Sequence, residues 1–172
     1  MRININLRLG AISMKIRIFA IGKIKEKYLK EGITEYLLRI RPFTNIEIVE
    51  VNDEPIVDNP NNADIEKAKN NEGQRILKLL KPNDYLIGLD LGKKQPNSLE
   101  FAEFLQEKLV VSGSNLNFVI GGSYGLSDEL KKRCNDSISL SNLTFLHQMT
   151  RLILLEQIYR AFKINRKETY HK

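Results

Sequence analysis

Short apolar runs recur along the chain, each bounded by glycine, proline or polar residues. Residues 15–22 (KIRIFAIG) and 46–51 (IEIVEV) alternate polar and apolar positions, and this period of two predicts strands. Residues 85–91 (YLIGLDL) and 116–120 (LNFVI) are nearly continuous apolar runs, as expected of strands that are covered on both faces. Residues 137–140 predict one more short strand.

Apolar residues at helical spacing fill the intervals between these strands. The pattern predicts helices over residues 26–41, 64–80, 98–111, a short segment after Ser127, and 147–163. Strands that alternate with helices predict an α/β fold with a mostly parallel sheet flanked by helices. Ligands bind such sheets beyond the carboxyl ends of the strands. Three loops are expected there: the one after Leu89, residues 121–125 and residues 140–145.

The length of 172 residues suits one domain with a sizeable core. No run approaches the roughly 18 apolar residues of a membrane-spanning helix, so we expect no membrane partner. The single cysteine, Cys134, can form neither an intramolecular disulfide nor a cysteine zinc cluster, which favours a reducing, cytoplasmic location. Residues 1–13 show an alternation of apolar and polar residues that is separate from the strand pattern after Met14. We interpret them as an extension ahead of a start at Met14.

The chain carries 27 basic and 21 acidic residues, a net charge of +6, and the excess lies near its ends. Residues 14–150 are balanced, whereas residues 151–172 hold six lysines and arginines against Glu156 and Glu168. A basic end on a neutral body favours a polyanionic partner such as nucleic acid. At this point the alternative is a solvated helix end whose cations complement the helix dipole.

A glycine cluster, IGGSYGLS, follows the strand over 116–120. Glycines there let a ligand approach the backbone closely, but they suit a tight strand-to-helix turn equally well. The cluster lacks the spacing of a dinucleotide site and the lysine of a P-loop.

The sequence offers no nucleophile paired with a base. His147 and His171 are too few for a metal site, and we expect His147 to cap the last helix. The missing metal and nucleophile favour chemistry supplied by a cofactor.

The segment LSNLTFLHQMTRLILLEQIYRAFKINRKETYHK, with FVIGGSYGLS before it, closely resembles the large-subunit ribosomal RNA methyltransferase H family. The resemblance covers about residues 14–172, is strongest over 118–172 and includes the Tyr170-His171-Lys172 terminus. It implies a single SPOUT-type domain with a C-terminal trefoil knot, acting as a homodimer.

The resemblance also implies a reaction. S-adenosylmethionine would methylate N3 of a pseudouridine in the helix 69 loop of 23S rRNA, on the assembled ribosome. The family's cofactor contacts fall here on Leu89, Gly121, Leu140, Ser141, Asn142, Leu143, Thr144 and Phe145. Two departures concern these loops: Lys93 stands where the family has glycine, and Leu146 stands where it has proline, which we expect to loosen the entry to the last helix.

Catalytic roles are expected near the C-terminus. His171 is a candidate base for the weakly acidic N3 proton, and Tyr170 could stack on the target base. Glu156 and Arg160 lie four residues apart on one helix face, either to orient the base or tail or as a surface ion pair. The expected phosphate contacts are Lys163, Arg166, Lys167 and Lys172.

The apolar stripe of the last helix is wide for a surface helix. Either part of it forms a dimer interface, or all of it packs on the sheet of its own chain. In a dimer, the tail of one subunit could reach the cofactor of the other. Two alternatives stay open: a non-catalytic RNA-binding module that assists ribosome assembly, and a methyltransferase of this class acting on another RNA position.

Overall fold

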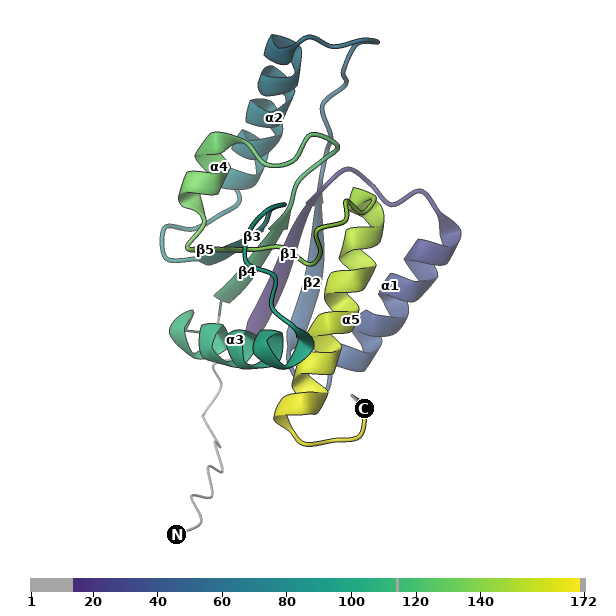
Figure 1. Ribbon diagram of the computed structural model, residues 1–172, viewed down its shortest axis with the longest axis vertical. Helices are drawn as coiled ribbons and strands as arrows, with labels where there is room; N and C mark the ends of the chain where they lie inside the picture. Colours follow the sequence, from purple (N-terminus) through teal and green to yellow (C-terminus); the bar gives the residue numbers. More distant parts are fainter. Residues whose placement is uncertain (1–13, 114, 171–172) are drawn as a thin grey trace.

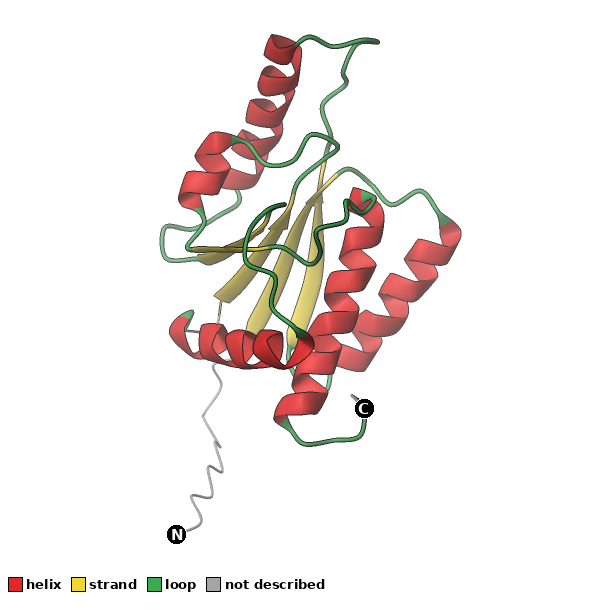
Figure 2. Cartoon of the chain, in the orientation of Figure 1, coloured by secondary structure: helices red, strands yellow, loops and turns green. Residues whose placement is uncertain are grey.

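A computed structural model describes residues 14–113 and 115–170; the extension 1–13, His171 and Lys172 lie outside the described residues. Strands and helices alternate along the described chain (Figures 1 and 2). The strands are β1 (Lys15–Ile21), β2 (Asn45–Val51), β3 (Tyr85–Leu89), β4 (Asn115–Ile120) and β5 (Asp136–Ile138). The helices are α1 (Lys27–Ile40), α2 (Asn62–Leu77), α3 (Ser98–Val111), α4 (Asp128–Arg133) and α5 (His147–Asn165).

The five strands form one parallel sheet in the order β2-β1-β4-β3-β5. One hydrophobic cluster joins one face of the sheet to α1, α3 and α5, and a second joins the other face to α2 and α4. This three-layer arrangement confirms the predicted sheet flanked by helices. In Figure 1 the carboxyl ends of the strands point toward the upper part of the view, where α5 begins.

Some boundaries differ from the sequence pattern. Helix α2 begins at Asn62 because Asn61 and Asp64 form a capping box, whereas apolar spacing placed the start two residues later. Helix α3 begins as expected, with Asn97 as its cap. Strand β3 ends at Leu89, two residues early, and the next amide, of Asp90, donates to the carbonyl of Ile138 (3.0 Å). Helix α5 extends to Asn165 rather than to residue 163.

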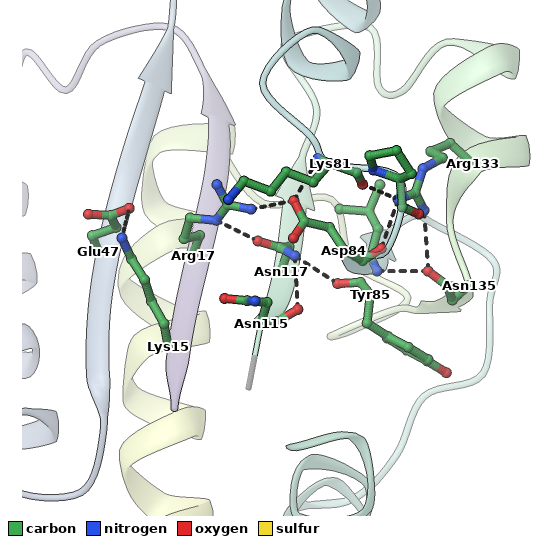
Figure 3. Close-up of polar contacts among 12 residues, drawn as sticks. Lys15, Arg17, Glu47, Lys81, Asp84, Tyr85, Asn115, Asn117, Arg133 and Asn135 are labelled. Atoms are coloured by element: carbon green, nitrogen blue, oxygen red, sulfur yellow. Dashed lines mark hydrogen bonds and ion pairs between the residues drawn. The ribbon is translucent and has the colours of Figure 1, made fainter. Parts of the chain in front are cut away.

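A polar network joins three strands on the face covered by α2 and α4 (Figure 3). Arg17 of β1 donates to the side-chain oxygen of Asn117 in β4 (2.8 Å) and pairs with Asp84 ahead of β3. The Asn117 amide then donates to the carbonyl of Tyr85 (3.0 Å). These bonds satisfy polar groups that the sheet and α4 cover, so they fix the relative positions of β1, β4 and β3.

Arg151 of α5 is completely buried and binds the carboxyl end of β1. Its Nη2 donates to the carbonyls of Ile21 (2.7 Å) and Gly22 (2.9 Å), and its Nη1 pairs with Glu50 of β2 (3.0 Å). Glu50 also accepts the backbone amide of Ile24 (3.0 Å). Burial lowers the pKa of Arg151, and the Glu50 carboxylate opposes that shift. One guanidinium therefore fixes the first turns of α5 against two strands.

Replacing this side chain should destabilise the fold. Arg151→Met removes three hydrogen bonds and leaves two strand-end carbonyls without this donor, which should lower the free energy of unfolding by about 3 kcal/mol. Urea denaturation followed by circular dichroism measures the change. Arg41→Met, at an exposed position after α1, is the matched control and should leave the unfolding midpoint unchanged. Equal midpoints for the two variants would contradict the role assigned to Arg151.

Candidate active site

A pocket of about 700 Å³ opens at the carboxyl ends of β3, β4 and β5. Its walls come from the loop after β3, the glycine loop after β4, the segment 139–146 after β5 and the first residues of α5. Figure 1 shows segment 139–146 crossing in front of the sheet to reach α5. The volume lies within the range of about 300–1,000 Å³ that is usual for small-molecule sites.

Most of the residues expected to bind a cofactor line this pocket. They are Leu89, Gly121, Leu140, Ser141, Leu143, Thr144 and Phe145. Asn142 does not line it, and its side chain instead accepts a hydrogen bond from Gln95 in the neighbouring loop. Strand topology therefore brings together the three loops that the sequence pattern placed at this edge.

The glycine loop is a tight turn. A Cβ atom on Gly121 would lie 2.5 Å from the backbone carbon of Gly125, a distance no side chain tolerates. Gly125 has a φ of 82°, and its amide donates to the carbonyl of Gly122 (3.1 Å). The turn alone therefore accounts for Gly121 and Gly125, and the same turn brings backbone to the pocket wall.

Hydrogen bonds between residues close in sequence shape the segment that follows β5. The Ser139 hydroxyl donates to the carbonyl of Ser141 (2.7 Å), and the Ser141 hydroxyl accepts the amide of Leu143 (3.0 Å). The Ser139 amide donates to the carbonyl of Lys94 (2.9 Å), which joins this segment to the loop after β3. The two loops thus form a continuous wall.

Leu146 keeps the backbone geometry that a proline would impose. Its φ is −57°, within the range of about −65 ± 15° to which proline is restricted. Its carbonyl accepts the amide of Thr150 (3.0 Å), which closes the first turn of α5. Leucine therefore preserves the local geometry at this position, and the expectation that it loosens the entry to the helix stays a prediction.

His147 is the first residue of α5 rather than its cap, because Leu146 occupies the cap position and no side chain caps this helix. The expected capping role is therefore wrong. His147 lines both the main pocket and an adjoining cavity of about 220 Å³ that also holds Asp53 and Glu72. Burial, and then the charge of Arg151, lower the pKa of His147, which favours a neutral ring at neutral pH. The sequence pattern gave no signal for this position in the pocket wall.

Tyr170, Glu156 and Arg160 meet in one cluster on α5. The Tyr170 hydroxyl donates to Glu156 (3.1 Å), Glu156 pairs with Arg160, and the Arg160 guanidinium lies 4.7 Å from the centre of the Tyr170 ring. Burial raises the pKa of Tyr170, so its phenol keeps its proton at neutral pH. Tyr170 is thus suited to donate or to stack, not to act as a base.

This cluster and the pocket are separate within one chain. None of Tyr170, Glu156 and Arg160 lines the pocket. Glu156 follows Thr150, the last pocket residue of α5, by six positions, which is about 9 Å along the helix axis. Figure 1 shows α5 running from the side of the sheet where the strands end toward the C-terminal end of the chain. Among the described residues, the Tyr170 cluster therefore does not reach the pocket of its own chain.

The basic tail residues are partly engaged within the chain. Lys163 pairs with Glu168, and the Arg166 guanidinium lies 4.4 Å from the centre of the Phe43 ring. Lys167 is exposed. A phosphate-binding role for these residues stays a prediction.

Residues 14–113 and 115–170 contain no cluster of three or more histidine, cysteine or carboxylate side chains placed to hold a metal ion. The same residues contain no helix that is long and apolar enough to cross a membrane. A parallel sheet with a pocket beyond its strand ends is typical of α/β proteins that bind a small molecule at that edge.

Comparison with known proteins identifies the class. A family model described as "Predicted SPOUT methyltransferase" matches residues 14–171. The chain is 51% identical over 159 residues to a ribosomal RNA large subunit methyltransferase H from Carboxydothermus hydrogenoformans, covering 92% of this chain and 100% of that protein. It is 49% identical over 161 residues to the protein of that name from Symbiobacterium thermophilum, with the same coverage. The chain belongs to the SPOUT methyltransferase family, which confirms the resemblance seen in the sequence.

One solved structure is a more distant match. It is a tRNA (m1G37) methyltransferase from Aquifex aeolicus, with 13% identity and a TM-score of 0.49 over 85% of this chain and 69% of that chain.

The glycine turn yields a paired test. Gly121→Ala forces a backbone clash and should lower the free energy of unfolding by about 3 kcal/mol, as overpacking does elsewhere. Gly125→Ala meets no neighbour within 4 Å but keeps a positive φ, which should cost about 1–2 kcal/mol. Urea denaturation of both variants measures the difference. A Gly125 variant less stable than the Gly121 variant would contradict the close approach described here.

Proposed function

We propose that this chain transfers a methyl group from S-adenosylmethionine to N3 of a pseudouridine in the helix 69 loop of 23S rRNA, on the assembled ribosome. The observation that carries the proposal is the pocket, because the loops that the family resemblance assigns to the cofactor form one cavity at the strand ends. The relatives' printed names support ribosomal RNA as the substrate class. The trefoil knot implied by the resemblance stays a prediction.

The residues present fit the methyl donor. The pocket has apolar walls that suit a planar base, formed by Leu89, Ile120, Leu140 and Phe145. The turn at Gly121 brings the backbone to the wall beside them. The pocket's one ion pair among described residues joins Asp90 to Lys131 (3.3 Å) at its wall. When bound, S-adenosylmethionine supplies an activated methyl group on a sulfonium.

The separation of the tail from the pocket supports a composite site in a homodimer. In this proposal, the Tyr170 cluster of one subunit lies over the pocket of the other. Arg160 and Glu156 hold the phenol in place, so that Tyr170 stacks on the target base. His171 follows directly and takes the N3 proton, since the phenol of Tyr170 keeps its own. Lys163, Arg166, Lys167 and Lys172 then lie near the RNA phosphates.

Labelled methyl transfer tests the reaction. Ribosomes that lack this modification are compared with free 23S rRNA, and the product nucleoside is identified by mass spectrometry. We expect N3-methylpseudouridine on ribosomes only. A different methylated nucleoside would show another target. Binding of S-adenosylhomocysteine and of ribosomes without any transfer would instead favour a non-catalytic RNA-binding module.

Subunit mixing tests the composite site. Removal of residues 168–172 should abolish transfer yet spare cofactor binding, and Thr144→Trp should fill the pocket yet spare the tail. Mixed dimers hold one intact pocket facing one intact tail, so equal mixing should restore about a quarter of the parent activity. The control is the methyltransfer activity of each variant refolded alone, which should be absent. Absence of rescue in verified mixed dimers would place tail and pocket in the same subunit.

A further inference from the structure

Four exposed lysines border the pocket on two sides. Lys23 and Lys25 lie in the loop after β1, and Lys93 and Lys94 lie in the loop after β3. In the sheet order β2-β1-β4-β3-β5, these strands flank β4, whose glycine loop forms the pocket wall between them. We call Lys23, Lys25, Lys93 and Lys94 the basic rim.

Both loops are attached directly to the pocket walls. On one side, the Lys25 amide donates to the side chain of Gln148 in α5 (3.3 Å). Gly22, ahead of Lys23, approaches the ring of His147, since a Cβ built on Gly22 would lie 3.6 Å from the His147 Nε2. On the other side, the carbonyl of Lys94 accepts the amide of Ser139 (2.9 Å). The rim is therefore held at a fixed place relative to the pocket.

The rim ammonium groups are not committed to ion pairs within the described chain. Other lysines near the pocket or in the tail do form ion pairs. Lys131 pairs with Asp90 (3.3 Å), and Lys163 pairs with Glu168. Glu26 lies in the same loop as Lys23 and Lys25, and its carboxylate is likewise without an ion pair there. Asp53, which lies beside Gly22 and lines the adjoining cavity, is a second carboxylate without an ion pair among the described residues. Four lysines against these two carboxylates leave the loops beside the pocket with a net positive charge.

We propose that the basic rim binds the phosphodiester backbone of the RNA substrate on both sides of the target nucleotide, which holds the base over the pocket. This inference rests on the proposed function. Phosphate contacts give RNA binding much of its affinity and its position, and free lysines release counterions when they make them. The rim also gives a role to Lys93, the position where the family pattern has glycine.

The test uses two paired variants, Lys23→Gln with Lys25→Gln, and Lys93→Gln with Lys94→Gln. The control pair is Lys78→Gln with Lys81→Gln, two exposed lysines ahead of β3 at the opposite edge of the sheet. Ribosomes lacking the modification are bound and methylated at several salt concentrations. S-adenosylhomocysteine affinity and oligomeric state are measured in parallel.

We expect each rim pair to weaken ribosome binding and raise KM roughly tenfold, with the loss in KM rather than in kcat. The slope of log affinity against log salt should fall by about 1.5, as for two lost phosphate contacts. The control pair should match the parent, and all variants should bind S-adenosylhomocysteine equally.

Two outcomes with the variants would overturn the inference, and so would one with the parent protein. One is a salt slope and KM equal to the parent's in both rim pairs. The other is a change of oligomeric state in a rim pair, which would assign the lysines to a subunit interface. Failure of the proposed function is distinguishable, because it appears as absent or different methylation by the parent protein itself. A parent that binds ribosomes without salt dependence would also exclude the rim.

Discussion

The buried guanidinium of Arg151 determines where the pocket lies. It binds two carbonyls at the end of β1 and a carboxylate of β2, so the first turns of α5 have one position against the sheet. His147 and Leu146 are placed by that turn, and the segment 139–146 is held between it and β5. A single desolvated cation, whose two terminal nitrogens donate to backbone and carboxylate oxygens, thus couples the sheet to the site.

The expected site residues of the described chain lie in two separate places. The pocket lies at the strand ends, whereas the Tyr170, Glu156 and Arg160 cluster lies farther along α5. This separation along α5 is the observation from which we propose that pocket and cluster come together between two subunits of a symmetric dimer.

The sequence predicted the sheet and the pocket loops because burial in a parallel sheet leaves strong apolar runs, and because glycines mark the turn at 121–125. Helix α2 was placed less well, since its first turn depends on a polar capping box between Asn61 and Asp64 rather than on apolar spacing. His147 in the pocket wall and the direction of Asn142 could not be predicted. Both depend on how segments distant in the sequence pack together, which the local spacing of apolar residues does not predict.

The bonds of Arg151 join residues about 130 positions apart in the chain. Contacts so distant in sequence close late, because the entropy of a large loop must be overcome first. A ribosome releases the N-terminal strands long before α5 emerges, so β1 and β2 leave the exit tunnel without the cation that binds their ends. A translation product interrupted before α5 would therefore lack this cation, the α5 part of the core and one wall of the pocket.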